Sequence, residues 1–209
     1  MLPFTGLLLA LAFVSPPQTR AQRATPRAIA HREFADKLSS AAIEQTHHVV
    51  RYTSAYVGIP YPGGDVPANT GVCTDVIIRA YRAAGIDLQK EVHEDMERNL
   101  SKYPRIAGSS HPRTDTNIDH RRVPNLMTFF TRKNSALPVT RSAEDYRPGD
   151  VVAWDLGRGV LHVGLVVDKK DPVSDRWMIV HNIGEGPKLE DVLFEWRIIG
   201  HYRYFGDAH

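Results

Sequence analysis

The feature that most constrains this chain is its single cysteine, Cys73, which lies between a Gly/Pro-rich loop and a helical pattern. The stretch from Tyr61 to Gly85 reads YPGGDVPANTGVCTDVIIRAYRAAG, with apolar residues at helical spacing after the cysteine and a glycine at its end. This pattern predicts that Cys73 occupies the first turn of a helix. The free amides and partial positive charge of a helix N-terminus favour a thiolate. The local pattern fits a nucleophile and a small buried thiol equally well.

An apolar run near the N-terminus indicates export. Residues 6–14 read GLLLALAFV, which is too short to span a bilayer, and Thr19-Arg20-Ala21 then fits a signal peptidase site. The alternative is an ordinary buried N-terminal helix, because no Lys or Arg precedes the run. We expect a signal peptide over 1–21, a flexible stretch over 22–32 and one domain over 33–209. The mature protein would then be periplasmic or secreted, without an integral membrane segment.

Export limits the roles that the single cysteine can have. A secreted chain with one cysteine cannot form an internal disulfide, so the thiol is a liability unless it is buried or used. The size and composition, 209 residues with 42% hydrophobic and 24% charged, are those of one soluble globular domain, and we expect a monomer. With 26 basic and 24 acidic residues, the chain has no charge excess that would indicate a nucleic-acid partner.

The order of predicted elements is helices first and sheet second, an α+β arrangement. Four helices are expected, over 33–56, from Cys73 to about 84, over 92–100 and over 125–132, with a loop over 103–116. Short Val/Ile/Trp-rich runs separated by polar breaks predict antiparallel strands over 149–156, 162–168, 177–184 and 194–205, with a bend at Gly200.

A charged group lies in the middle of the chain. We expect these side chains to form a salt-bridged, solvated surface, or alternatively one wall of a substrate groove. They are His93, Glu94, Asp95, Asp119, His120, Arg121 and Arg122.

Two histidines in the predicted sheet are candidate partners for Cys73. A nucleophilic thiol needs a base within hydrogen-bond reach, and that base needs an orienting partner. If the strands of His162 and His181 pair as a hairpin, His162 could take the thiol proton while His181 fixes its tautomer. Gly164 shares the face of His162 and would leave room for an approaching helix end. The alternative is that both are ordinary sheet histidines.

Serial motifs carry a resemblance to known proteins. They run in order from about residue 50 to 205 and are YPGG, GVCTDVIIRAYRAAGIDLQ, VHEDM, NIDHRRVPNL, YRPGDVVAWDLG, HVGL, HNIGEG and GHYRY. With these motifs the chain resembles the NlpC-type cell-wall cysteine peptidases, papain-like enzymes that cut amide bonds in peptidoglycan stem peptides. It more closely resembles a bacterial envelope family catalogued as a domain of unknown function.

The resemblance implies a papain-like NlpC-type fold and a site. Cys73 matches the nucleophile, His162 the general base and His181 the polar residue that orients it. Tyr61 matches a tyrosine near the nucleophile, and the amide of Cys73 would supply one oxyanion donor. The family pattern Asp-Cys-Ser-Gly is replaced here by Val-Cys-Thr-Asp, so a carboxylate lies within a turn of the thiol.

That carboxylate, Asp75, could bind a cationic substrate group, cap the helix or raise the thiol pKa. Asn182, directly after His181, is the remaining candidate for contact with substrate or oxyanion.

The function expected from these features is a cysteine amidase or endopeptidase acting on peptidoglycan peptides, with no cofactor and no metal. A second possibility is a non-catalytic module of the same fold that binds muropeptides. A third is a zinc hydrolase, which lacks support because no His-x-x-x-His or Cys-x-x-Cys spacing is present. Its potential ligands would be His93, His111, His120, His162, His181 and His201.

Overall fold

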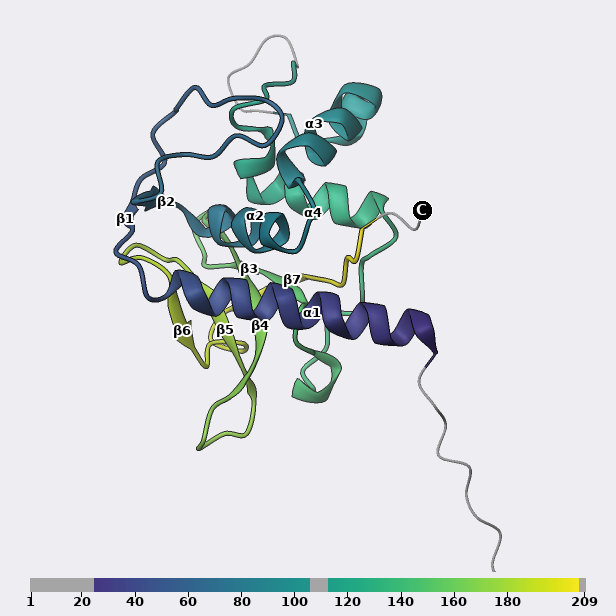
Figure 1. The fold of residues 1–209 in the computed structure, drawn as a ribbon, viewed down its shortest axis with the longest axis vertical. Coiled ribbons are helices and arrows are strands. Elements are labelled where there is room, and N and C mark those ends of the chain that lie inside the picture. Colours follow the sequence, from purple (N-terminus) through teal and green to yellow (C-terminus); the bar gives the residue numbers. More distant parts are fainter. Residues whose placement is uncertain (1–24, 106–112, 207–209) are drawn as a thin grey trace, which may run out of the picture.

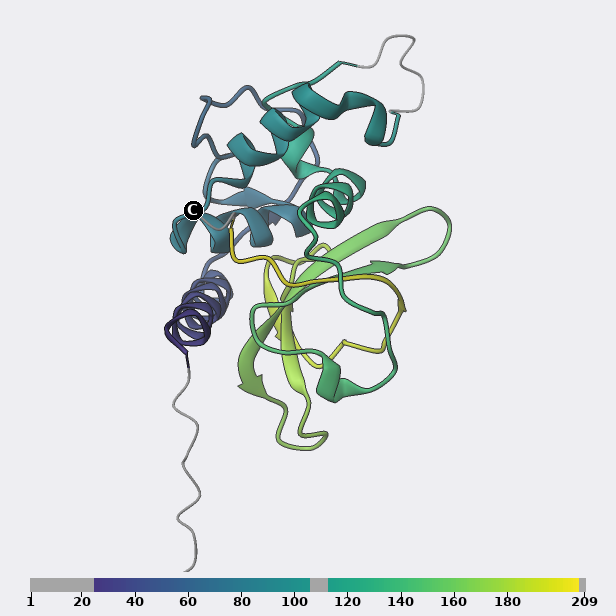
Figure 2. The same cartoon turned by 90° about the vertical axis from the view of Figure 1, so that its right-hand side faces the viewer.

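The computed structural model describes residues 25–105 and 113–206, so the expected signal peptide over 1–21 lies outside the described residues. The α+β expectation is confirmed: a group of helices from the first part of the chain packs on an antiparallel sheet from the last part. Figure 1 shows α1 crossing in front of the sheet. Figure 2 shows the other helices stacked above the sheet and α1 nearly end-on beside it.

The helices begin at recognisable caps. Thr25 accepts a hydrogen bond from the amide of Ala28 at 3.2 Å at the start of α1, and Asp87 accepts one from Gln89 at 3.0 Å at the start of α3. The α-helices are α1 (Pro26–Gln45), α2 (Cys73–Ala83), α3 (Leu88–Asn99) and α4 (Val123–Arg132). The 3₁₀ helices are η1 (Leu100–Lys102), η2 (Asp119–Arg121) and η3 (Ala143–Asp145).

The prediction for α1 was wrong at both ends. The helix starts at Pro26, inside the stretch expected to be flexible, because Thr25 caps it and proline is favoured in a first turn. It ends at Gln45 rather than near residue 56, since the chain then turns into a short strand.

The main sheet has five strands in the order β6-β5-β4-β3-β7, all antiparallel. Its register pairs Trp154 with His162 and Gly164 with His181, so both histidines lie on one face. A register shift in β7 beside Gly200 agrees with the expected bend. The strands are β3 (Val151–Asp155), β4 (Leu161–Lys170), β5 (Trp177–His181), β6 (Lys188–Glu190) and β7 (Arg197–Tyr202).

The sheet separates two apolar clusters. The larger one joins the helices to the sheet and contains Leu38, Ile77, Phe129 and Val163. The smaller one covers the other face and contains Trp154 and Tyr146 among its members. Strand β4 is in contact with α1, α2 and α4, so it is the central element of the fold.

A short parallel pair, which the sequence did not predict, leads the chain into α2. Strand β1 (Arg51–Tyr52) pairs with β2 (Thr70–Gly71), placing Tyr52 opposite Gly71 and thus close to Cys73. No helix within residues 25–105 and 113–206 has the length and apolar character needed to cross a membrane.

The expectation of a solvated charged surface between residues 93 and 122 was wrong. Five of those side chains are buried, His93, Asp95, Asp119, His120 and Arg121. Four of the five are buried with partners: His93 Nδ1 lies 3.0 Å from Asp119, Arg132 Nε lies 2.6 Å from Asp95, and Arg121 Nε lies 2.9 Å from Asp75. The Nδ1 atom of His120 has no hydrogen-bond partner among the described residues. Burial of charged groups is tolerated when each finds a partner of opposite charge.

Candidate functional site

Cys73 begins α2, as the sequence predicted, and is 5% exposed. Its thiol interacts with the backbone amides of Val163, Thr74 and Cys73 itself. Val163 directly follows His162 on β4, so the thiol lies against the strand that carries the histidine. The helix start and the central strand therefore meet at the sulfur atom.

Burial dominates the ionisation of this thiol. It raises the pKa of Cys73 to about 11, while the amide of Val163 acts in the opposite direction by stabilising the thiolate. The Asp75 carboxylate adds a smaller upward contribution to the thiol pKa. At neutral pH the resting cysteine is therefore a thiol and not a thiolate.

The side chain of Asp75 has a structural role at the start of α2. Its carboxylate is buried, accepts a hydrogen bond from the Val72 amide at 2.7 Å, and caps α2. Arg121 of η2 holds the same carboxylate with two hydrogen bonds of 2.9 Å each. Of the three roles considered for Asp75, capping and raising the thiol pKa describe this arrangement. Contact with a cationic substrate does not, because Arg121 already occupies that position.

The two histidines form a hydrogen-bonded pair. His162 Nε2 and His181 Nδ1 lie 2.8 Å apart, and His181 Nε2 lies 2.8 Å from a carboxylate oxygen of Glu190 on β6. Burial and, to a smaller extent, the neighbouring His181 together lower the pKa of His162 to about 3. Burial also lowers the pKa of His181, although Glu190 opposes this effect. Both rings are neutral at pH 7.

This row of contacts fixes the position of each proton. A carboxylate can only accept, so opposite Glu190 the His181 ring carries its proton on Nε2 and its Nδ1 is bare. His181 Nδ1 therefore accepts from His162 Nε2, and His162 keeps a bare Nδ1. The arrangement can thus supply one unprotonated imidazole nitrogen, held in a single tautomer. Glu190 was not predicted, since its approach to His181 depends on the pairing of a three-residue strand.

Aromatic rings hold the pair in place. Trp154 stacks on His162 with ring centroids 5.8 Å apart, and Trp196 meets both histidine rings edge-on at 5.9 Å. Gly164 makes this packing possible, because a Cβ there would lie 2.7 Å from Ile179 and 3.1 Å from the Cβ of His181. The space beside Gly164 is therefore filled by neighbouring strands and not by the helix end that the sequence suggested.

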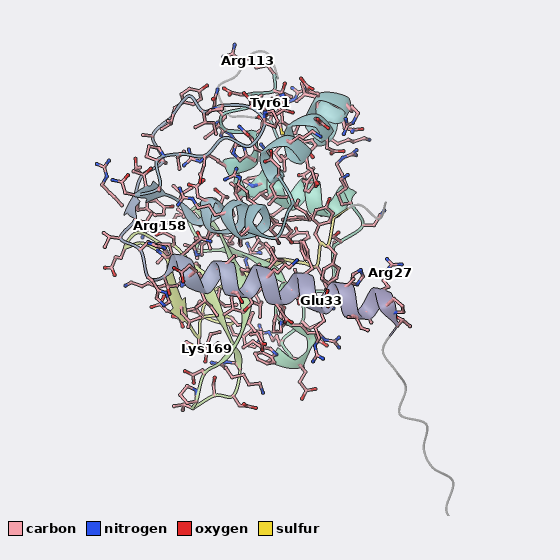
Figure 3. The ribbon with its side chains drawn as sticks, in the orientation of Figure 1. Arg27, Glu33, Tyr61, Arg113, Arg158 and Lys169 are labelled. Carbon is pink, nitrogen blue, oxygen red and sulfur yellow. The ribbon has the colours of Figure 1, made fainter. Side chains whose placement is uncertain are left out.

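Tyr61 lies elsewhere than expected. Its ring packs on His93 of α3 at 5.1 Å, and Figure 3 shows it at the top of the molecule near that helix. The tyrosine brought to the cysteine is Tyr52, whose pKa is raised by burial and then by Cys73 and Asp75. Tyr52 is 40% exposed, so it marks the solvent side of the thiol.

Asn182 is buried directly after His181. Its Oδ1 accepts a hydrogen bond from the Gly184 amide at 3.2 Å, and its Nδ2 has no hydrogen-bond partner among the described residues. A buried amide donor without a partner is uncommon. It is consistent with an expected contact to an oxyanion or substrate, which stays a prediction.

Four of the histidines considered as metal ligands, His93, His162, His181 and His201, have other partners, whereas the buried Nδ1 of His120 has none among the described residues. His201 Nε2 lies 2.7 Å from Asp150, and His93 pairs with Asp119, while His111 lies outside the described residues. Within the described ranges, no group of three His, Cys, Asp or Glu side chains is arranged to hold a metal ion.

Residues 39–204 match the family described as a domain of unknown function, DUF1287. The chain belongs to this family. The DUF1287 chain is also 48% identical over 170 residues to the uncharacterized protein YijF of Escherichia coli K12, a match that covers 80% of both sequences.

A solved structure is similar to this DUF1287 chain at a lower level. It is described as similar to a lipoprotein of the NLP/P60 family, from Staphylococcus aureus subsp. aureus Mu50. The TM-score is 0.42 at 15% sequence identity, over 91% of the present chain and 46% of the other. The chain therefore spans less than half of that protein, and the likeness assigns no activity.

Proposed function

We propose that the protein is a thiol hydrolase that cleaves an amide bond in peptidoglycan stem peptides. The observation that supports this most is the row His162–His181–Glu190, which leaves one bare imidazole nitrogen on the strand that touches the Cys73 thiol. A thiol, a base of fixed tautomer and an orienting group are the components of nucleophilic catalysis. The resemblance of the motifs to cell-wall cysteine peptidases supports the substrate class.

In the proposed reaction, the bound amide reaches the thiol from the side marked by Tyr52. The Cys73 sulfur attacks the carbonyl carbon as its proton passes to Nδ1 of His162. His162 then gives that proton to the leaving amine, the C–N bond breaks, and a thioester remains on Cys73. Water attacks the thioester with His162 as base, which releases the carboxylic acid and restores the thiol.

The Cys73 thiol and the His162 ring are both neutral before substrate binds. Because the thiol pKa is about 11 and the pKa of His162 is about 3, the ion pair of thiolate and imidazolium is unfavourable before substrate binds. Proton transfer is therefore coupled to attack, and the developing imidazolium is stabilised through His181 by Glu190. Tyr52 takes the position near the nucleophile that the motifs suggested for Tyr61, and Asn182 is the proposed side-chain donor to the oxyanion.

We place this activity in the bacterial envelope, in the periplasm or outside the cell, with residues 1–21 as a signal peptide and a monomeric mature chain. The support is the apolar N-terminal run and the single cysteine.

The test is digestion of purified peptidoglycan followed by mass spectrometry of the released muropeptides. Wild-type protein is expected to create new carboxyl and amino ends, and Cys73→Ala and His162→Ala are each expected to lower the rate by about 10³-fold or more. Circular dichroism at matched temperatures shows whether each variant is folded. Cleavage retained by folded Cys73→Ala would contradict the proposal.

A second candidate is a muropeptide-binding module without activity. The observation that favours it is the near-complete burial of Cys73, with its raised thiol pKa. This alternative predicts saturable binding of muropeptides by the wild type with no change in their mass during long incubation. Mass changes that disappear in Cys73→Ala would exclude it.

A further inference from the structure

A cavity of about 620 Å³ lies between the loop before η3 and the segment that leads into β7. One wall is formed by Val139, Thr140 and Arg141, and the other by Phe194, Trp196 and Arg197. None of these residues takes part in the bond making, bond breaking or proton transfers of the proposed reaction. A cavity of this size can hold a group as large as a sugar ring or a dipeptide.

The lining combines positive charge with aromatic surface. Among the described residues that line it, the charged side chains are those of Arg141 and Arg197. Arg197 is paired with Asp155, whereas the exposed Arg141 side chain has no hydrogen bond or ion pair to another residue of the described ranges. An arginine in this situation can form two parallel hydrogen bonds to a carboxylate.

The aromatic rings are held before any ligand arrives. Phe194 packs edge-on against Tyr146 at 5.9 Å, and the guanidinium of Arg176 lies 6.0 Å from its centroid. Trp196 is fixed against Trp154 at 6.1 Å. Flat apolar surfaces of this kind accept the apolar face of a ring or aliphatic group at low entropic cost.

Trp196 links the cavity to the proposed active site. The same indole that lines the cavity contacts the rings of His162 and His181, each at 5.9 Å. A group bound in the cavity therefore lies one side chain away from the histidine pair.

We infer that this cavity binds a carboxylate-bearing group with an apolar face, held by Arg141 and packed on Trp196. Resting on the proposed function, we assign it as the subsite for the part of the cell-wall substrate next to the amide that is cut. Two parts of such a substrate carry this chemistry: the acidic residue of the stem peptide, and the lactyl-substituted sugar, whose carboxylate becomes free when its amide bond to the peptide is cut.

The experiment measures binding by calorimetry with three probes: N-acetylmuramic acid, N-acetylglucosamine, which lacks the carboxylate, and the dipeptide L-alanyl-D-glutamic acid. It uses the full chain carrying Cys73→Ala, so that binding is measured apart from hydrolysis. Arg141→Gln is expected to weaken binding of the carboxylate probe about tenfold. Arg27→Gln, which changes an exposed arginine at the start of α1 (Figure 3), is the matched control and should leave the affinity unchanged.

Each outcome has a defined meaning. Binding of the muramic acid in preference to N-acetylglucosamine identifies the sugar as the occupant, and binding of the dipeptide alone identifies the peptide carboxylate. Absence of saturable binding by both carboxylate probes, equal binding of N-acetylglucosamine, or an Arg141→Gln variant as tight as the control overturns the inference. If binding is found but wild-type protein never cleaves peptidoglycan, the proposed hydrolysis fails and the binding site stands.

Discussion

At the scale of single residues, Glu190 acts on a nitrogen that it does not touch. Its carboxylate binds His181, which in turn binds His162, so its charge selects the tautomer of the proposed base. Glu190→Gln keeps the size of the side chain but removes the charge. We expect kcat for peptidoglycan cleavage to fall about 10- to 100-fold with little change in KM.

The control for this substitution is Glu185→Gln, which removes an exposed carboxylate that pairs with Lys188 on the surface. It should retain wild-type kinetics. The imidazole N–H signals of His162 and His181 in NMR spectra report the tautomers directly. If Glu190→Gln matches Glu185→Gln in both kcat and these signals, Glu190 does not orient the pair.

The ionisation of Cys73 gives a second prediction. Because burial raises its pKa to about 11, its alkylation by iodoacetamide should keep rising with pH above 9. At pH 7.5 we expect a rate at least about tenfold below that of free cysteine, whose pKa is about 8.5. Mass spectrometry of the labelled protein gives the rate, and the same protein in urea is the control. A rate that is already constant below pH 8 would indicate a resting thiolate instead.

The places of Cys73 and His162 in the fold were predictable from the sequence at this scale, and the exceptions have a common cause. The sequence pattern predicts that Cys73, the lone cysteine, lies at a helix start. The alternating pattern around His162 predicts that His162 lies on a strand. Glu190 and Tyr52 lie on strands of three and two residues, whose partners are set by long-range pairing. No local pattern specifies which side chain such a strand brings to the site.

At the scale of elements, the buried ion pair between Asp75 and Arg121 joins η2 to the start of α2. Both side chains are nearly inaccessible to solvent, at 2% and 3% exposed respectively. Arg121→Met would leave the buried carboxylate without its partner, and we expect a loss of about 3–5 kcal/mol in the free energy of unfolding. Urea denaturation measures this loss.

The matched control is Arg98→Met, which removes an exposed arginine paired with Glu94 on α3. Surface pairs of this kind contribute about 0–1 kcal/mol, so its stability should stay close to that of the wild type. Equal losses in the two variants would mean that the buried pair has no special role.

Elements with strong internal patterns were predictable, and those stabilised by distant partners were not. The helix after Cys73 and strands β3, β4 and β5 follow from apolar periodicity. The charged segment before α4 was assigned to the surface because composition alone cannot reveal pairing. Its burial results from partners such as Asp75 and His93, which come from other helices.

At the scale of the whole molecule, buried neutral histidines make stability depend on pH. Burial lowers the pKa of His162 to about 3 and that of His120 to about 4. Between these values and about 6.5 the unfolded chain binds more protons than the folded one, so stability falls as the pH is lowered. For His162 alone the loss between pH 7 and pH 5 is about 2 kcal/mol.

Urea denaturation at pH 7 and pH 5 checks this prediction. The histidine pair can be isolated with His162→Gln, whose stability should change less between the two pH values than that of the wild type. His47→Gln, at an exposed position, is the control and should retain the full dependence. Equal stability of the wild type at both pH values would contradict the assignment of neutral buried rings.

The central position of β4 has a consequence for how the chain folds. Cys73 comes from the helical half, whereas His162, His181 and Glu190 come from strands that follow about 90 or more residues later. The contacts that join them close long loops, which is the slow kind of step in folding. No N-terminal fragment that ends before β6 therefore contains the complete constellation. Until strands β4 to β6 have emerged and docked, the cysteine of a chain still being made lacks the histidine pair and Glu190.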